Sequence, residues 1–167
     1  HAERAAEIAA ALPPFVNVVG LFVNATPEFI NETLAQVPIG LLQFHGDEDE
    51  TYCRQFERPF LKAARFRPDL YLLRYSASFP STHGLLLDAF VEGYGGAGHT
   101  FDWSLIPKAL SRPIVLSGGL NVDNVSEAVR RVRPLAVDVS SGVEVSKGVK
   151  DHAKIAAFIA GVRNADV

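Results

Sequence analysis

Two apolar runs of the chain each end in small residues and glycine, a pattern that could hold a phosphate group. The runs are PIVLSGG at Pro113–Gly119 and LAVDVSSG at Leu135–Gly142, and a helical pattern follows each of them. Backbone N–H groups at the start of a helix, aided by the helix dipole, attract an anion without Lys or Arg. We therefore expect Gly118 and Gly119 to contact a phosphate.

The second run offers hydroxyl and amide donors from Ser140, Ser141 and Gly142. The plainer alternative is that both runs are tight turns between a strand and a helix. Because two such loops follow consecutive strands, the phosphate interpretation is favoured. In a (β/α)8 barrel, the loops after the last two strands form the phosphate site.

A single carboxylate ends another apolar run, since Asp88 follows the three leucines of Leu85–Leu87. Such a residue is a candidate general acid or base, or else a cap for the next loop, and the pattern alone does not choose. The glycine run Gly93–Gly98 comes directly behind it and lacks the Gly-Lys-Ser/Thr of a P-loop. It is either a turn or a place where the backbone approaches a substrate closely.

Polar residues also end an earlier predicted strand, where Gln43 and His45 precede an acidic segment that runs to Glu50. Carboxylates favour the start of a helix, and no His or Glu recurs at the four-residue spacing of a helical metal site. We therefore expect no metal here. Cys53 falls inside the predicted helix, away from the strand ends, and is expected to be structural.

Composition indicates an ordinary cytoplasmic globular protein of 167 residues with 48% hydrophobic residues. The formal net charge of −3 argues against nucleic acid, which clustered Lys and Arg normally meet. One cysteine excludes an internal disulfide framework. The apolar stretch from Ile8 to Val23 is interrupted by Pro13, Pro14 and Asn17, so no membrane span or signal peptide is expected.

Apolar runs and helical patterns alternate along the chain, which predicts a parallel sheet covered by helices. Strands are expected at Phe15–Val23, Ile39–Phe44, Phe60–Phe66, Gly84–Asp88, Pro113–Leu116 and Leu135–Val139. Helices are expected at Ala2–Ala11, Thr26–Gln36, Glu48–Phe56, Leu70–Tyr75, Trp103–Leu110, Val122–Val132 and Lys150–Val162.

The predicted fold is a (β/α)8 TIM barrel of the α/β class, a single domain over residues 1–167 that supplies six strand–helix units. Six strands do not close an eight-stranded barrel, and the chain contains no methionine. We therefore expect these to be strands 3–8 of a domain that is incomplete at its N-terminus.

Several stretches together resemble the phosphoribosylanthranilate isomerase family of tryptophan biosynthesis. The stretches are PPFVNVVGLFVN (Pro13–Asn24), LLQFHGDE (Leu41–Glu48), LLLDAFVEGYGGAGHTFDWSLI (Leu85–Ile106), LSGGLNVDNVSEAV (Leu116–Val129) and VDVSSGVEVSKGVKDHAKIAAFI (Val137–Ile159). The resemblance implies an Amadori rearrangement of an aminoaldose phosphate to an aminoketose phosphate, without cofactor or metal, in a monomer or homodimer.

By the same resemblance, Asp88 is the general acid that opens the furanose ring. The residues that it implies for the phosphate and the rest of the substrate are Gln43, His45, Gly96, Gly98, Gly118, Gly119, Ser141 and Gly142. Asp102 and Trp103 of the FDW motif are expected to be a helix cap and a packed indole.

The sequence departs from the family pattern in two places. Ala97 stands where Thr or Ser is usual, and the first-strand motif with the cysteine general base is absent, as is the second-strand loop whose arginine meets the anthranilate carboxylate. Another phosphosugar barrel enzyme would share the phosphate loops, although the GYGGAG and FDW motifs favour the isomerase. A second alternative is a naturally shortened, inactive protein that binds phosphate or a partner.

Overall fold

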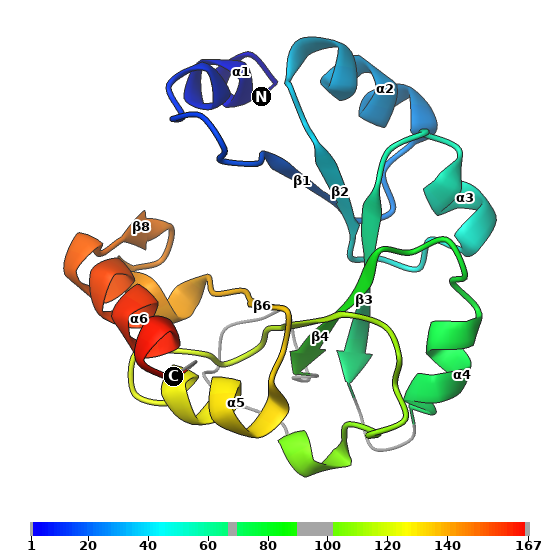
Figure 1. Ribbon diagram of the computed structural model, residues 1–167. Helices are drawn as coiled ribbons and strands as arrows, with labels where there is room; N and C mark the ends of the chain where they lie inside the picture. The colour runs from blue at the N-terminus through cyan, green and yellow to red at the C-terminus, as the bar shows by residue number, and fades with distance from the viewer. Residues whose placement is uncertain (1, 67–69, 90–101, 166–167) are drawn as a thin grey trace. The chain divides into compact units, whose positions relative to one another are not determined.

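The computed structural model describes residues 2–66, 70–89 and 102–165. These residues form two compact units. The first contains His1–Ala63 and Ala77–Gly84, and the second contains Ala64–Ser76 and Leu85–Val167. Strands and helices alternate along most of the chain (Figure 1).

The first unit is built from short parallel strands and the helices between them. Its elements are α1 (Ala2–Ala10), β1 (Val19–Phe22), α2 (Pro27–Gln36), β2 (Leu41–Phe44), α3 (Glu50–Arg54) and the start of β3 (Phe60–Phe66). Strand β1 pairs with β2, and β2 pairs with β3, both in parallel.

The second unit repeats this alternation and adds a hairpin. Its elements include most of α4 (Leu72–Ala77) and β4 (Gly84–Ala89), then η1 (Trp103–Leu105), β5 (Ile114–Leu116), α5 (Val125–Val132), β6 (Ala136–Val137), η2 (Ser141–Val143), β7 (Glu144–Ser146), β8 (Val149–Lys150) and α6 (His152–Ala165). The strand order β1-β2-β3-β4-β5-β6 follows the sequence order. The predicted parallel α/β sheet is therefore confirmed.

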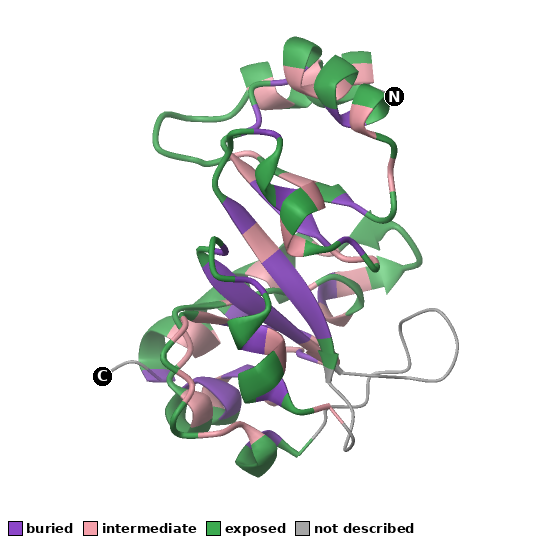
Figure 2. Cartoon of the chain, turned by 90° about the vertical axis from the view of Figure 1, so that its right-hand side faces the viewer, coloured by how far each residue is buried: buried purple, intermediate pink, exposed green. Residues whose placement is uncertain are grey.

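Each unit has its own apolar core, and the buried strand residues lie mainly in β2, β3, β4 and β5 (Figure 2). In the first unit the Phe44 ring packs against Phe56 and Phe60, with ring centroids 5.8 and 5.9 Å apart. In the second unit Leu85 and Leu87 of β4 and Leu116 of β5 belong to one apolar cluster with residues of α5 and α6. Helices α5 and α6 meet at Gly161, whose carbonyl accepts a 2.8 Å hydrogen bond from Ser126 Oγ.

Local sequence signals predict the helix starts well. Thr26 Oγ1 accepts the Phe29 N–H at the start of α2, and Asp49 Oδ1 accepts the Tyr52 N–H at the start of α3. Asp102 caps η1 by accepting the Ser104 N–H at 2.9 Å. The helix cap expected at Asp102 of the FDW motif is confirmed, whereas Asn124 at the start of α5 makes no side-chain cap hydrogen bond.

Several expected elements are shorter than predicted, among them α3, β2 and β6. Strand β1 begins at Val19 because Phe15, with a φ of 69° and a fully exposed ring, cannot continue a strand. The helix expected over Trp103–Leu110 is a single 3₁₀ turn, since Pro107 lacks the N–H that a longer helix needs. Helix α5 begins at Val125 rather than Val122.

Candidate active site

The carboxyl ends of β4, β5 and β6 bring three polar residues to one edge of the second unit. The three strands pair in register, and Asp88, Ser117 and Asp138 come next after their paired residues. Ser117 donates its backbone N–H to Leu87 O at 2.8 Å and its hydroxyl to Asp138 Oδ2 at 2.9 Å. Asp88, expected from the sequence, therefore lies on the same edge as the first glycine loop.

Ser117 and Asp138 follow predicted strands, where active sites of such folds lie, but they were not among the residues expected to act on the substrate. Asp88 is half-buried at this edge.

The loop after β5 has a backbone that requires glycine. Gly118 and Gly119 have φ values of 79° and 70°, in the left-handed region that other residues rarely adopt. The amide of Asn124 donates to Gly119 O at 3.0 Å, and the Asn121 N–H donates to Asn124 Oδ1 at 2.9 Å. The Asn124 side chain therefore connects Gly119 and Asn121 and stabilises the loop.

The start of α5 does not follow Gly119 directly, which corrects the sequence interpretation. The N–H groups of Asp123 and Asn124 donate to Asn121 Oδ1 at 2.8 and 3.2 Å. The local Asn turn occupies these amides before the helix begins at Val125. The helix start expected at the phosphate loop is thus displaced along the chain.

The loop after β6 touches the loop after β5. A Cβ on Gly142 would overlap the carbonyl oxygen of Leu120, so only glycine permits this approach. Ser141 and Gly142 lie in η2, directly behind Ser140. The structure therefore brings together the two loops that the sequence pattern singled out.

Lys150 anchors this second loop from the β7–β8 hairpin, which the sequence analysis did not predict. Its ammonium donates to Ser140 O at 2.9 Å, Ser140 Oγ at 3.3 Å and Glu144 Oε1 at 2.7 Å. The hydrogen bond and charge of Lys150 hold the pKa of the Glu144 carboxyl below its usual value. Gly148, with a φ of 81°, was the available turn signal for the hairpin.

Gln43 and His45 lie at the end of β2 in the first unit and contact each other. Gln43 Nε2 is 3.2 Å from His45 Nδ1, and the His45 N–H donates to Phe22 O at 2.9 Å. Gln43 is buried, although it is polar. The remaining expected residues, Gly96 and Gly98, lie outside the described residues.

Neither the acidic segment after β2 nor Cys53 offers reactive groups. Glu48 is buried and hydrogen-bonded to two backbone N–H groups and to Lys62. Within the described ranges, no three His, Cys, Asp or Glu side chains gather as metal ligands. Cys53 is fully buried, and burial raises the pKa of its thiol to about 12.

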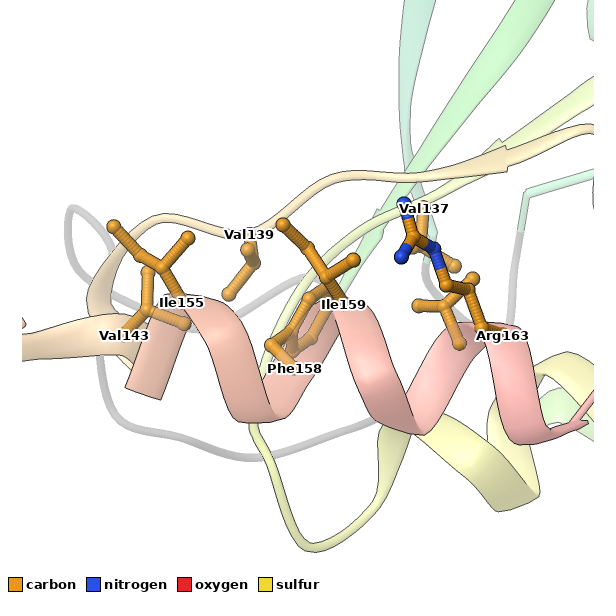
Figure 3. Close-up of a pocket in the computed structure, with 8 residues that line it drawn as sticks. Val137, Val139, Val143, Ile155, Phe158, Ile159 and Arg163 are labelled. Carbon is orange, nitrogen blue, oxygen red and sulfur yellow. The ribbon is translucent and has the colours of Figure 1, made fainter. Parts of the chain in front are cut away.

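The second unit also contains an apolar pocket of about 400 Å³ between β6 and α6 (Figure 3). It is lined by Val137, Val139, Val143, Ile155, Phe158, Ile159, Val162 and Arg163. Among the described lining residues Arg163 alone is charged and the other seven are apolar, so the pocket is chemically unlike a phosphate site. None of the described helices is long and apolar enough to cross a membrane.

The parallel sheet, with an acid and two glycine loops at its carboxyl ends, is typical of a TIM-barrel-like α/β enzyme. The solved structure of phosphoribosyl anthranilate isomerase from Thermotoga maritima shares this fold, with a TM-score of 0.90 and 42% identity. That match covers 98% of this chain and 81% of the other. A phosphoribosyl anthranilate isomerase in complex with reduced 1-(o-carboxyphenylamino)-1-deoxyribulose 5-phosphate matches with a TM-score of 0.85 and 39% identity, covering 98% of this chain and 80% of the other.

Sequence comparison identifies the particular family. The family model described as N-(5'phosphoribosyl)anthranilate (PRA) isomerase matches residues 1–161. The N-(5'-phosphoribosyl)anthranilate isomerase of Dechloromonas aromatica is 65% identical over 164 residues, 98% of this chain and 79% of that protein. The protein of the same name from Leptothrix cholodnii is 56% identical, over 97% of this chain and 74% of that protein. The chain belongs to the N-(5'-phosphoribosyl)anthranilate isomerase family, an enzyme family of tryptophan biosynthesis.

Proposed function

We propose that, in the isomerase reaction of this family, Asp88 is the general acid and the loops after β5 and β6 bind the substrate phosphate. The observation that carries the proposal is the half-buried Asp88 carboxyl on the same strand-end edge as Ser117 and Gly118. The substrate is the phosphorylated small molecule N-(5'-phosphoribosyl)anthranilate, named in the family description.

The proton of Asp88 would go to the furanose ring oxygen as the bond between that oxygen and C1 breaks. The anthranilate nitrogen lone pair forms the C=N bond of a ring-opened Schiff base. A base then removes the C2 proton to give an enolamine, and tautomerisation gives the aminoketose. Neither an oxidant nor a reductant is consumed, because hydrogen only moves between atoms of one substrate.

The phosphate would be held by backbone N–H groups of the two touching loops. Gly118 and Gly119 leave the backbone bare of side chains, and Ser141 and Gly142 lie in the loop that packs against it. Gln43 and His45 are assigned to the substrate by family resemblance and by their mutual contact at a strand end. Gly96 and Gly98 are assigned by the resemblance alone.

The general base is not assigned to any of these residues. The cysteine base that the resemblance implies belongs to a motif that the 167 residues do not include. Cys53 does not replace it, because its thiol is buried inside α3 of the first unit.

The six strands are proposed to correspond to strands 3–8 of the barrel. Their consecutive parallel order supports this numbering, as does the chain's coverage of about four fifths of each matched structure. We further propose a cytoplasmic, biosynthetic enzyme that is a monomer or a homodimer. One of the matched structures is described as monomers generated from a dimeric isomerase.

Turnover separates this proposal from an inactive phosphate-binding protein, which the high identity to named isomerases does not favour. The full-length protein, with the proposed strands 1 and 2, is mixed with N-(5'-phosphoribosyl)anthranilate, with and without a metal chelator, and the aminoketose product is followed by chromatography. We expect the same turnover in both mixtures. Saturable binding without product would contradict the isomerase proposal, and loss of turnover with the chelator would contradict metal-free catalysis.

A further inference from the structure

A buried ion pair in the first unit lies beneath the loop that carries His45. Lys62 Nζ is 3.2 Å from Glu48 Oε2, and the two side chains are 1% and 2% exposed. Lys62 pairs in register with Phe44, whereas Gln43 points to the opposite face of the sheet. The pair therefore lies on the face that carries the aromatic core.

The Glu48 carboxylate joins two strand-end loops. Its Oε1 accepts the Asn24 N–H at 2.7 Å, and its Oε2 accepts the Gly46 N–H at 2.9 Å. A Cβ on Gly46 would overlap Asn24, which shows how closely the loops after β1 and β2 approach each other. Asn24 Oδ1 in turn accepts the Asp47 N–H at 2.7 Å.

The Lys62 ammonium holds the same loop through its carbonyl groups. Nζ donates to Gly46 O at 2.7 Å and more weakly to Phe44 O at 3.4 Å, the carbonyls on either side of His45. It also lies 5.6 Å from the centre of the Phe79 ring. Since the His45 N–H donates to Phe22 O, the backbone on both sides of His45 is held by hydrogen bonds.

We infer that Glu48 and Lys62 are positioning residues, which hold the loop after β2 so that His45 meets the substrate in a defined orientation. This inference rests on the proposed substrate contact of His45. A buried ion pair is weak evidence for stability, because an apolar pair can be equally stable. The geometry here points to orientation, since each bond of the pair to the backbone ends on one of the two loops or on Phe44, the last residue of β2.

The test is a double-mutant cycle on kcat/KM. The neutral pair Glu48→Gln with Lys62→Met keeps the approximate volumes and removes both charges, so no buried charge is left unpaired. We expect kcat/KM to fall at least tenfold, mainly through KM. In a His45→Ala background, the same pair of substitutions should have little further effect, because positioning acts through a ring that is no longer present.

A matched control separates orientation from stability. Ile30→Ala removes buried side chain from α2 of the same unit without touching the loop, so it should lower the melting temperature and leave kcat/KM unchanged. Equal losses of kcat/KM from the neutral pair with and without His45 would overturn the inference, as would an unchanged kcat/KM.

If the neutral pair does not fold, Glu48→Gln alone is put through the same cycle. If His45→Ala itself leaves kcat/KM unchanged, the proposed role of His45 is wrong, while the role of Asp88 is tested separately.

Discussion

At the scale of single residues, burial distinguishes the Cys53 thiol from the Asp88 carboxyl, the two side chains that could be considered as catalytic groups. Cys53 is the only thiol of the chain, but it lies fully inside the first unit. Asp88 is half-buried at a strand end, where a carboxyl can meet a substrate. The position of each residue in the fold, rather than the intrinsic nucleophilicity of its side chain, therefore favours Asp88 over Cys53 as the catalytic candidate.

The raised pKa of Cys53 predicts a loss of stability at alkaline pH. Burial favours the neutral thiol, so the folded pKa of about 12 exceeds the ordinary thiol pKa of 9.0. The stabilising contribution is complete below pH 9 and is lost as the pH rises toward 12. Urea unfolding between pH 8 and 11 should show the free energy of unfolding falling with pH, and less steeply in Cys53→Ala.

Tyr52 has a raised pKa for the same reason and adds a loss of the same sign at higher pH. The comparison of Cys53→Ala with the parent chain isolates the thiol, because both proteins keep Tyr52. If the free energy of unfolding falls equally steeply with pH in the parent chain and in Cys53→Ala, the loss of stability does not come from the thiol. Turnover of Cys53→Ala at pH 7 should equal that of the parent, since the thiol takes no part in the reaction.

At the scale of elements, the two phosphate loops depend on close backbone contact. Gly142→Ala would place a Cβ on the Leu120 carbonyl and push the loop after β6 away from the loop after β5. We expect at least a tenfold loss of affinity for the reduced product analogue, roughly 1.4 kcal/mol, measured by calorimetry. Gly148→Ala is the control, because its Cβ meets no atom within 4 Å. It strains a positive φ but should leave affinity unchanged, and an equal loss from both changes would contradict the proposed role.

The β7–β8 hairpin should make the second loop sensitive to acid. The pKa of Glu144 is lowered by its hydrogen bond from Lys150, so the stabilising contribution is present above the ordinary glutamate pKa of 4.5 and is lost as the pH falls. Amide hydrogen exchange at Ser141 and Gly142 should therefore accelerate, relative to the intrinsic rate, as the pH falls below 4.5.

Lys150→Met should abolish this acid dependence, because it removes the ammonium that holds Glu144 and Ser140. Lys147→Met changes the same charge at the turn of the hairpin and should preserve the dependence. If the parent chain and Lys150→Met show the same acid response, the ion pair does not hold the loop.

Element order was predictable from the sequence, whereas several boundaries were not. Strong local signals such as Thr26 and Asp49 define helix starts because one side chain satisfies a backbone N–H. The start of α5 was missed because Asn121 and Asn124 build a turn from side-chain hydrogen bonds that apolar periodicity does not report. The Lys150 anchor was missed because it depends on a hairpin of very short strands.

At the scale of the whole molecule, membership of the isomerase family assigns the separate motifs to a single reaction. Glycine loops alone suit several phosphosugar enzymes, and the sequence pattern left Asp88 open between acid and cap. Coverage of 98% of this chain at 65% identity to a named isomerase resolves the class of reaction. The buried Glu48–Lys62 pair was beyond sequence reasoning, because the two residues meet only after β2 and β3 have paired.

Single-turnover kinetics of Asp88→Asn test the central claim most directly. The amide keeps the shape of the side chain but cannot give up a proton as a carboxyl does, so with saturating enzyme the rate of product formation should fall roughly 10²–10⁴-fold. Affinity for the reduced product analogue should be nearly unchanged. Asp123→Asn, an equal charge change at an exposed loop position, should keep the parent rate. A near-parent rate in Asp88→Asn would contradict the account, since ring opening would then not depend on this carboxyl.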